Sequence, residues 1–278
     1  MKFRRSERLI DMTTYLIEHP RQVVPLTFFA DRYGSAKSSI SEDLAIIKQT
    51  FEERGLGTLQ TIAGATGGVK YSVKISEQEA RPFVEELCQL IASPDRLLPG
   101  GYLYMTDILG DPSIVQRAGK IIASAYADSS IDVVMTVATK GIPLAYAVAS
   151  QLNVPVVMVR RDNKVTEGST VSINYVSGST KRIQTMVLSK RSLSEGSKVL
   201  IVDDFMKAGG TIKGMISMLE EFRAHVSGIA VLVESEEIEE RLVDDYISLV
   251  QLSNVNEKEK TINVKTGNFF NQNKEGLQ

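Results

Sequence analysis

Apolar side chains fall at helical spacing in the first fifty residues and at strand spacing in the twenty that follow. Residues 5–18, 26–33 and 37–51 repeat apolar positions every three or four residues, which predicts three helices. Residues 58–62 and 69–73 are two short runs joined by the small residues AGATGG, and they predict a β-hairpin. The first quarter of the chain therefore predicts three helices followed by a hairpin.

Beyond residue 75 the pattern changes to apolar runs that alternate with helical stretches. Ser76 followed by Glu79 forms a capping box, which predicts a linker helix over 76–92. Continuous apolar runs of four to eight residues are typical of strands buried on both faces. Strands are predicted at 132–138, 155–159, 183–188, 199–202, 226–233 and 248–252, and helices at 113–127, 142–151, 212–222 and 238–246.

The whole pattern predicts an α/β protein: an N-terminal winged helix-turn-helix followed by a mostly parallel sheet flanked by helices. We expect the domain boundary near residue 74, with residues 1–74 in one domain and 75–278 in the other. Ligands of parallel sheets bind outside the carboxyl ends of the strands, so the loops there are the candidate ligand sites. The polar segment 254–278 is expected to be frayed in its last ten residues.

Composition narrows the class of protein. The chain of 278 residues is 43% hydrophobic and 24% charged, as in ordinary globular proteins, and no apolar run reaches membrane-spanning length. Its N-terminus lacks the apolar core of a signal peptide, and Cys88 is the single cysteine, which together predict a cytoplasmic protein. With His19 and His225 as the two histidines, no metal site is predicted.

The net charge of −2 hides an asymmetry between the two predicted domains. Residues 1–74 contain 11 Lys and Arg against 8 Asp and Glu, whereas the remainder contains 21 against 26. A basic N-terminal module on an acidic body is a mild indication of nucleic-acid binding.

The third predicted helix begins with small polar side chains beside one lysine. Such a helix can enter the major groove, where hydroxyls and an ammonium group reach base edges and phosphates. The alternative is a small helical domain used for contacts with protein or RNA. The candidate DNA-contacting residues are Lys37, Ser38, Ser39 and Ser41, with Arg5 and, near the hairpin tip, Gly67 and Lys70.

The stretch VLIVDDFMKAGGT, residues 199–211, predicts a strand, a loop and the start of a helix. Asp203 and Asp204 follow the strand directly, and a glycine pair opens the helix. Glycine lets backbone N–H groups approach an anion closely, and a helix N-terminus adds positive potential. Paired acids beside such a phosphate cradle suit a ligand with both hydroxyls and phosphate. An ordinary strand-to-helix turn with a solvated acid pair is the alternative.

A second tight loop, residues 138–141, follows the strand predicted at 132–138. Lys140 supplies charge there, and the backbone amides of 139–141 supply donors for an anion. A third segment, 160–181, is rich in Gly, Ser, Thr and Asn, and we expect a structureless loop that acts as a lid. Its candidate closing contacts are Lys164, Thr166, Ser169 and Ser172; a solvated basic loop or a DNA-facing surface is the alternative.

Residues 199–211 resemble the signature of the type I phosphoribosyltransferases, which bind 5-phosphoribosyl 1-diphosphate (PRPP). The resemblance implies that Asp203 and Asp204 hold the ribose hydroxyls, that 207–211 hold the 5-phosphate, and that 138–141 hold the diphosphate, with Mg²⁺ accompanying it. Residues 97–112 resemble the segment that covers the base in adenine-type enzymes, although Tyr102 and Tyr104 can also be interpreted as core. The implied effector site comprises Asp203, Asp204, Phe205, Met206, Lys207, Ala208, Gly209, Gly210, Thr211, Ala138, Thr139, Lys140, Gly141 and Tyr102.

The chain departs from the transferase signature at Phe205, Lys207 and Ala208, where that family has smaller residues or a threonine. We therefore expect an inactive transferase fold; the alternative is a working purine phosphoribosyltransferase with an accessory DNA domain. Residues 26–29 and 36–41 resemble the N-terminal domain of the Gram-positive purine operon repressors, and the likeness extends over nearly the full chain. It implies a homodimeric repressor of purine biosynthesis genes that PRPP releases from DNA.

Overall fold

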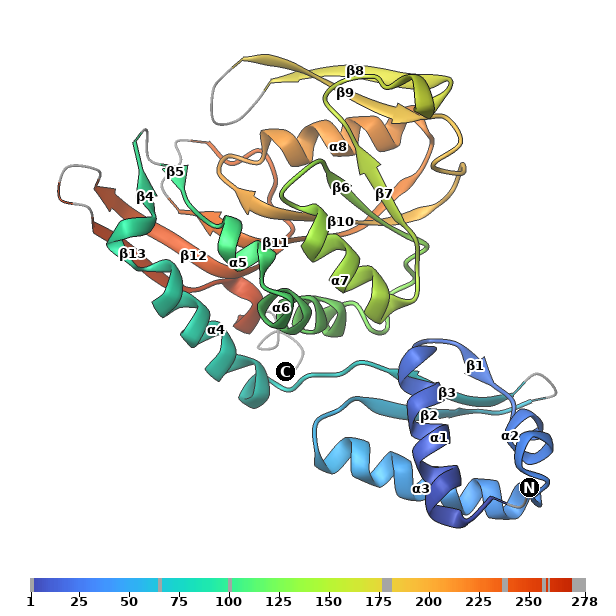
Figure 1. The fold of residues 1–278 in the computed structure, drawn as a ribbon. Coiled ribbons are helices and arrows are strands. Elements are labelled where there is room, and N and C mark those ends of the chain that lie inside the picture. The colour runs from blue at the N-terminus through green and yellow to red at the C-terminus, as the bar shows by residue number, and fades with distance from the viewer. Residues whose placement is uncertain are drawn as a thin grey trace.

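The computed structural model describes residues 3–64, 67–99, 102–176, 182–236, 240–256, 259 and 261–271. Figure 1 shows two bodies joined by the segment that runs from the N-terminal sheet to helix α4 (Glu77–Ile91). Three apolar cores account for the packing. One of them lies within residues 12–71, and the other two are built from residues 73–270.

The N-terminal body is the predicted winged helix-turn-helix. Its helices begin and end close to the predicted residues, and strand β1, which the sequence did not predict, joins the hairpin in an antiparallel sheet of order β1-β3-β2. Gly34, in the left-handed conformation at φ 57°, ends α2 and turns the chain toward α3. The elements are α1 (Arg5–Glu18), β1 (Val23–Val24), α2 (Leu26–Tyr33), α3 (Lys37–Glu53), β2 (Thr58–Ile62) and β3 (Gly68–Ser72).

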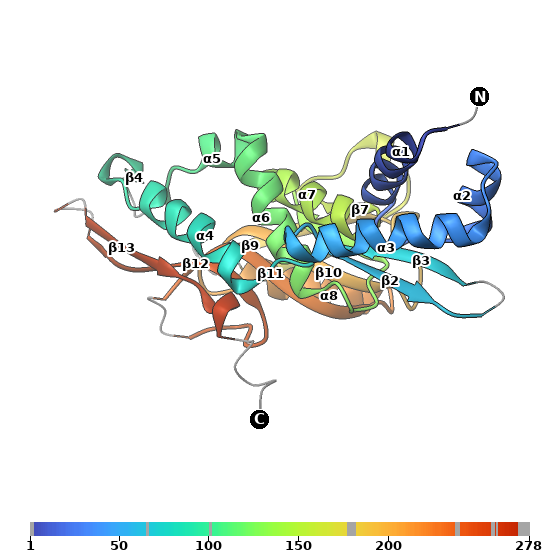
Figure 2. The same cartoon turned by 90° about the horizontal axis from the view of Figure 1, so that it is seen from below.

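Helices α1 and α3 are tied together by a buried carboxylate as well as by apolar packing. Asp43, on the inner face of α3, is 1% exposed. It accepts hydrogen bonds from Nε of Arg5 at 2.8 Å and from Nε of Arg8 at 2.9 Å. Two guanidinium groups compensate the burial of the charge. The angle between α1 and α3, visible in Figure 2, is therefore fixed by polar contacts as well as by the core.

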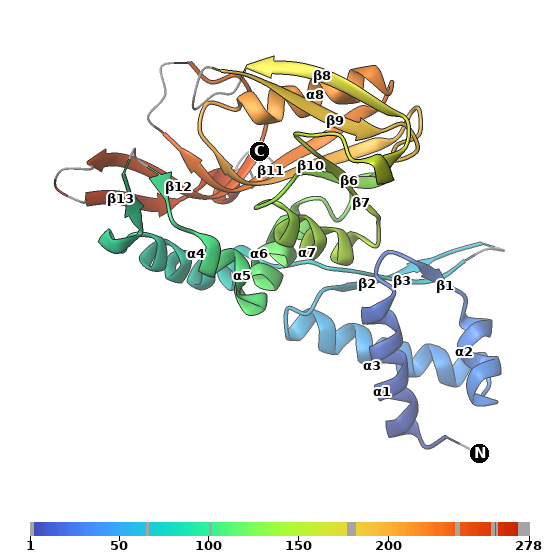
Figure 3. The same cartoon turned by 45° about the horizontal axis from the view of Figure 1, so that its top comes forward.

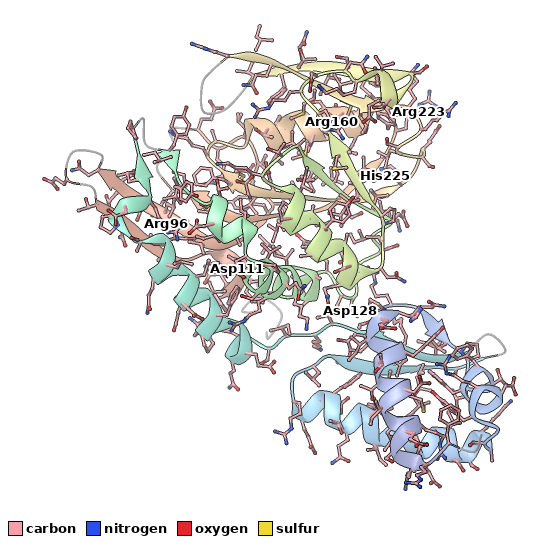
Figure 4. The ribbon with its side chains drawn as sticks, in the orientation of Figure 1. Arg96, Asp111, Asp128, Arg160, Arg223 and His225 are labelled. Carbon is pink, nitrogen blue, oxygen red and sulfur yellow. The ribbon has the colours of Figure 1, made fainter. Side chains whose placement is uncertain are left out.

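The two bodies meet at the turn between α6 (Pro112–Ala125) and β6 (Val133–Val137). Arg21, at φ 62°, donates from its backbone N–H to Tyr71 O and from Nη2 to Ser129 O, both at 2.6 Å. Burial lowers the pKa of Arg21, and the charges of Asp128 and Asp132 oppose that shift. Figure 4 labels Asp128 on the face that meets the N-terminal body. One arginine thus links the winged helix to the second domain.

Helix α4 starts with the capping box expected from the sequence. The Ser76 hydroxyl accepts from Glu79 N–H at 3.3 Å, and the Glu79 carboxylate accepts from Ser76 N–H at 2.9 Å. These reciprocal bonds satisfy backbone donors that the first turn of a helix leaves free. The prediction of the linker helix is confirmed.

The C-terminal domain is built on a six-stranded sheet of order β13-β12-β11-β10-β6-β7. All neighbouring pairs are parallel except β12 with β13, so the predicted mostly parallel α/β sheet is confirmed. Its strands are β6, β7 (Val156–Val159), β10 (Lys198–Met206), β11 (His225–Ser235), β12 (Ile247–Asn256) and β13 (Thr261–Thr266). The helices are α4, α5 (Thr106–Gly110), α6, α7 (Ile142–Leu152) and α8 (Gly210–Glu221); a small sheet pairs β4 (Leu97–Leu98) with β5 (Tyr102–Leu103).

Helices cover both faces of this sheet, which is why its central strand is apolar on both sides. Leu200 and Val202 point into the core formed with α4, α5, α6 and α7. Val199 and Ile201 point into the core formed with α8. Figure 3 shows α8 and the hairpin of β8 (Thr170–Val176) and β9 (Ile183–Ser189) on one side and α4 to α7 on the other.

The structureless loop predicted at 160–181 is wrong over most of its length, whereas its role as a lid stays a prediction. Arg160 bridges to Val187, residues Val165–Glu167 form a 3₁₀ turn, and β8 pairs with β9 in antiparallel register. Val171 and Ile173 pack against the core beneath α8 while Ser172 between them faces solvent. Residues 177–181 lie outside the described residues.

Two further predictions need correction. Residues 240–246 form an irregular segment with bends at Leu242 and Asp245 rather than part of the predicted helix 238–246, whose first two residues lie outside the described part. The C-terminal segment contributes strand β13 and a 3₁₀ turn with Phe269 and Phe270 buried, so fraying does not begin at residue 269. Residues 272–278 lie outside the described residues. Within the described part of the chain, none of the helices has the length and apolarity needed to cross a bilayer.

Candidate functional site

The two predicted anion loops lie at the same edge of the sheet. Strands β6 and β10 are parallel neighbours, with Val133 beside Val199 and Met135 beside Ile201. Their carboxyl ends therefore open on one side, where residues 138–141 follow β6 and residues 207–209 follow β10. This is the position at which open α/β sheets bind their ligands.

The acid pair lies at the end of β10 and is more buried than a solvated pair would be. Asp203 is 4% exposed and Asp204 is 9% exposed, and Asp203 Oδ1 accepts from the Asp204 N–H at 3.0 Å. Burial raises the pKa of Asp203 well above its usual range, and the neighbouring Asp204 charge raises it further. Burial also raises the pKa of Asp204, although the positive charge of Lys140 opposes that effect. The interpretation of a merely solvated pair is therefore wrong.

The loop after the acids opens directly into α8. Gly209 is the residue before the helix, at φ 88°, a conformation that favours glycine. No side chain caps this helix start, so its first amides point into the site. Lys207 is exposed beside them. Free amides, a helix N-terminus and a lysine together form a phosphate-binding arrangement.

The loop at 138–141 comes close to the acid pair. Its Ala138–Thr139 peptide bond is cis. A Cβ added at Gly141 would lie 2.3 Å from Thr136 Oγ1 and 2.8 Å from Asp203 Oδ1, so only glycine fits there. The Thr136 hydroxyl is buried and has no hydrogen-bond partner among the described residues. The start of α7 also lacks a side-chain cap, which gives the site a second helix N-terminus.

Basic side chains surround this edge. Lys140 acts on Asp204, and Arg161, which follows β7, acts on Asp203. Arg160, labelled in Figure 4, is held by Glu167 at 3.1 Å, and Lys164 pairs with Asp162. The predicted role of Lys164 in closing the site stays a prediction, since its ammonium group is already paired. The charge of Arg161 lowers the pKa of Asp203, and sequence reasoning did not single out this arginine.

Residues 97–112, the segment expected to cover a base, expose two tyrosine rings. Tyr102 lies on β5 with 57% of its surface exposed, and Tyr104 is 43% exposed, so the interpretation of either ring as core is wrong. Arg96 instead anchors this region through two bonds of 2.7 Å to the Asp107 carboxylate. Tyr102 as an effector contact stays a prediction.

The candidate DNA-binding surface is at the start of α3. Lys37, Ser38 and Ser41 are exposed there and Ser39 is half-buried. Ile40 and Leu44 turn the opposite face of α3 into the core. Lys70 lies on the central strand β3 and Gly67 lies just before it. Arg5 binds Asp43, a contact that the sequence did not reveal because the two residues are 38 positions apart.

Comparison with known proteins accounts for both halves. Residues 4–73 match the family described as the bacterial purine repressor N-terminal domain, and residues 105–266 match the phosphoribosyl transferase domain. An adenine phosphoribosyltransferase from Thermoanaerobacter pseudethanolicus superposes with a TM-score of 0.54 at 24% identity, over 60% of this chain and 99% of that one. The class is thus a DNA-binding domain joined to a phosphoribosyltransferase fold.

Two curated relatives specify the family. The chain is 66% identical over 277 residues to the purine biosynthesis transcriptional repressor of Bacillus subtilis, covering 100% of this chain and 97% of the relative. It is 49% identical over 268 residues to the purine biosynthesis transcriptional activator of Lactococcus lactis subsp. lactis, covering 96% and 99%. The chain belongs to the family of bacterial purine repressors.

Proposed function

We propose that this protein represses purine biosynthesis genes in the cytoplasm and is released from DNA when PRPP binds its C-terminal domain. The buried acid pair between two uncapped helix starts is the observation that carries the proposal. Relatives are named both repressor and activator, and the higher identity to the Bacillus repressor favours repression.

PRPP matches the chemistry of the site. Its 5-phosphate suits the amides of 209–211 at the start of α8, with Lys207 beside them. Its diphosphate suits residues 138–141 at the start of α7, with Lys140 supplying charge. The ribose hydroxyls between those two anionic groups donate to the carboxylates of Asp203 and Asp204. Mg²⁺ enters with the diphosphate as its counter-ion in this proposal.

The winged helix supplies DNA recognition in this proposal. The start of α3 enters the major groove, with Lys37 on phosphate or base and the serine hydroxyls on base edges. The hairpin joint, residues 63–68, lies along the sugar-phosphate backbone of the DNA in this proposal; residues 65 and 66 lie outside the described part. A homodimer presents two such helices to a palindromic site.

We infer that the transferase fold is catalytically inactive. Phe205 and Lys207 replace smaller residues of the transferase signature, and Ala208 replaces a threonine. The match of residues 105–266 to the transferase domain keeps a working purine phosphoribosyltransferase as the second candidate. Pyrophosphate release from PRPP with adenine, guanine, xanthine and hypoxanthine discriminates the two.

The deciding experiment is fluorescence anisotropy with labelled purine-promoter DNA. PRPP with Mg²⁺ is titrated into the complex, and ribose 5-phosphate and pyrophosphate are titrated separately as matched fragments. Release by PRPP at a concentration at which neither fragment acts supports one site that reads both anionic groups. Equal release by pyrophosphate alone reduces the effect to competition for positive charge, and no release by PRPP refutes the proposal.

A further inference from the structure

Residues 240–246 lie against the loop proposed to bind the 5-phosphate, residues 207–211, here called the phosphate loop, instead of forming a helix. The Leu242 N–H donates to Ala208 O at 2.9 Å, so the carbonyl of the loop is bound from outside. Val243, which is buried, comes close to Gly209: a Cβ added to that glycine would lie 3.1 Å from Val243 Cγ2. The segment therefore contacts both the backbone and the glycine that open α8.

Arg241 fastens this segment to the end of β11. Its Nη2 donates to Ser235 O at 2.8 Å, and its buried Nη1 forms an ion pair with Glu234 Oε2 at 3.2 Å that lacks hydrogen-bond geometry. Its guanidinium carbon also lies 5.2 Å from the centre of the Tyr246 ring. The arginine thus joins the strand and both ends of the segment.

Glu234 is the anchor of these contacts. It is 1% exposed, lies beside Met206 in the sheet, and accepts from Ser248 Oγ at 2.6 Å and from the Tyr246 hydroxyl. Burial and the nearby Glu234 carboxylate raise the pKa of Tyr246, so the phenol remains a donor. A buried carboxylate with three partners favours one arrangement of its surroundings, because losing Arg241 leaves the charge unpaired and losing either hydroxyl leaves an oxygen without its donor.

A second layer secures the network to the C-terminal turn. Asn268 donates from Nδ2 to Tyr246 O at 2.8 Å, and its Oδ1 accepts from Ser248 N–H at 2.8 Å. The Asn268 N–H donates to Ser248 Oγ at 3.1 Å. The connections run from the C-terminal turn through β12 and β11 to the phosphate loop.

We propose that Glu234 and Arg241 are positioning residues that preorganise the phosphate loop for its anion. They act through Leu242 and Val243, which hold Ala208 and Gly209 in the conformation that points the amides of α8 into the site. A loop held in its binding geometry before the ligand arrives loses less conformational entropy on binding. The ligand, PRPP, rests on the proposed function, whereas the ordering of the loop is a property of the free protein.

The test uses Arg241→Ala in the full-length protein, with Arg241→Lys as the conservative variant and Arg223→Ala as the matched control. Arg223 also pairs with a glutamate, Glu195 at 3.3 Å, but lies at the opposite end of α8 (Figure 4). Amide hydrogen exchange of residues 207–212 is measured without ligand, and PRPP and DNA affinities are measured separately. Loss of outer-shell partners in metal sites costs about 10- to 100-fold in affinity.

For Arg241→Ala we expect faster exchange confined to 207–212 and 240–246, and PRPP binding weaker by about 10-fold. DNA affinity stays unchanged, Arg241→Lys restores part of the loss, and Arg223→Ala changes neither reading. Unchanged exchange in 207–212, or exchange that rises equally throughout the domain, overturns the proposal. If wild type does not bind PRPP, the proposed function fails, but the exchange measurement still decides whether the network orders the loop.

Discussion

Replacing both acids by Asp203→Ala and Asp204→Ala should give a protein that binds DNA as tightly as wild type and is no longer released by PRPP. The two carboxylates lie in the C-terminal core region, whereas the winged helix has an apolar core of its own. Loss of two negative charges does not weaken attraction to DNA phosphates. The expected variant is a constitutive repressor.

The size of the effect follows from the burial of the pair. Hydrogen bonds to a charged group contribute about 1.5–3 kcal/mol each. Counting each acid at the low end, the ligand loses about 3 kcal/mol, which is roughly 150-fold in PRPP affinity. Both acids are already buried in the free protein, so ligand binding removes little further water from them. The hydrogen bonds to the ligand therefore contribute to affinity without a large desolvation cost, and the variant should lose their whole contribution.

The assay is DNA affinity of both proteins by anisotropy, with and without saturating PRPP and Mg²⁺. Glu220→Ala with Glu221→Ala is the matched control, because it removes two exposed charges from the same domain. Release of the Asp203 and Asp204 double variant at the wild-type PRPP concentration would show that these acids are not the effector site.

Lys37→Ala should weaken DNA binding and lower the dependence of DNA affinity on salt by a slope of about 1, with PRPP affinity unchanged. Lys48→Ala, on the same helix, should leave DNA binding unchanged. Equal DNA binding by both variants excludes the start of α3 from the DNA interface. Pyrophosphate release should stay below about 1 per second with all four bases, and faster turnover would establish an enzyme. The pKa of Asp203 in the folded protein is raised above 3.8, so ionising this carboxyl lowers the stability of wild type as the pH rises above about 4. The melting temperature of Asp203→Asn should therefore rise relative to that of wild type as the pH increases from about 4. A difference in melting temperature that does not change with pH contradicts the raised pKa.

The sequence predicted the parts of the fold in which local pattern and tertiary packing agree. Helix α1 has the predicted bounds because its apolar stripe and the His19-Pro20 stop are both local signals. Strand β10 was recognised from four apolar residues because both faces of the sheet are covered. The positions of the loops 138–141 and 207–209 were predicted for the same reason, since each follows a strand of this kind, whereas their binding of anions stays a prediction.

The failures lie where a distant contact decides the local conformation. The Leu242 N–H donates to Ala208 O, 34 residues earlier, instead of to a carbonyl within a helix, so residues 240–246 are not helical. Val171, Ile173 and Tyr175 of β8 face the core beneath α8 while Ser172 and Asn174 between them face solvent, and this mixed composition resembles a loop. The burial of Asp43 depends on Arg5 and Arg8, which no local pattern reveals.

The position of Arg21 has a consequence for how a signal can travel. Its bond to Ser129 lies at the amino end of the sheet, where the Asp132 carboxylate also accepts from Lys198 N–H at 2.8 Å. Asp203 is five residues further along β10, roughly 17 Å away at the rise of a strand. A close-packed parallel sheet of this kind does not stretch measurably between its two ends. In the proposed function, a ligand at this edge can therefore act on the contact at Arg21 by tilting the domain as a rigid body, and a small tilt there becomes a larger displacement at the start of α3.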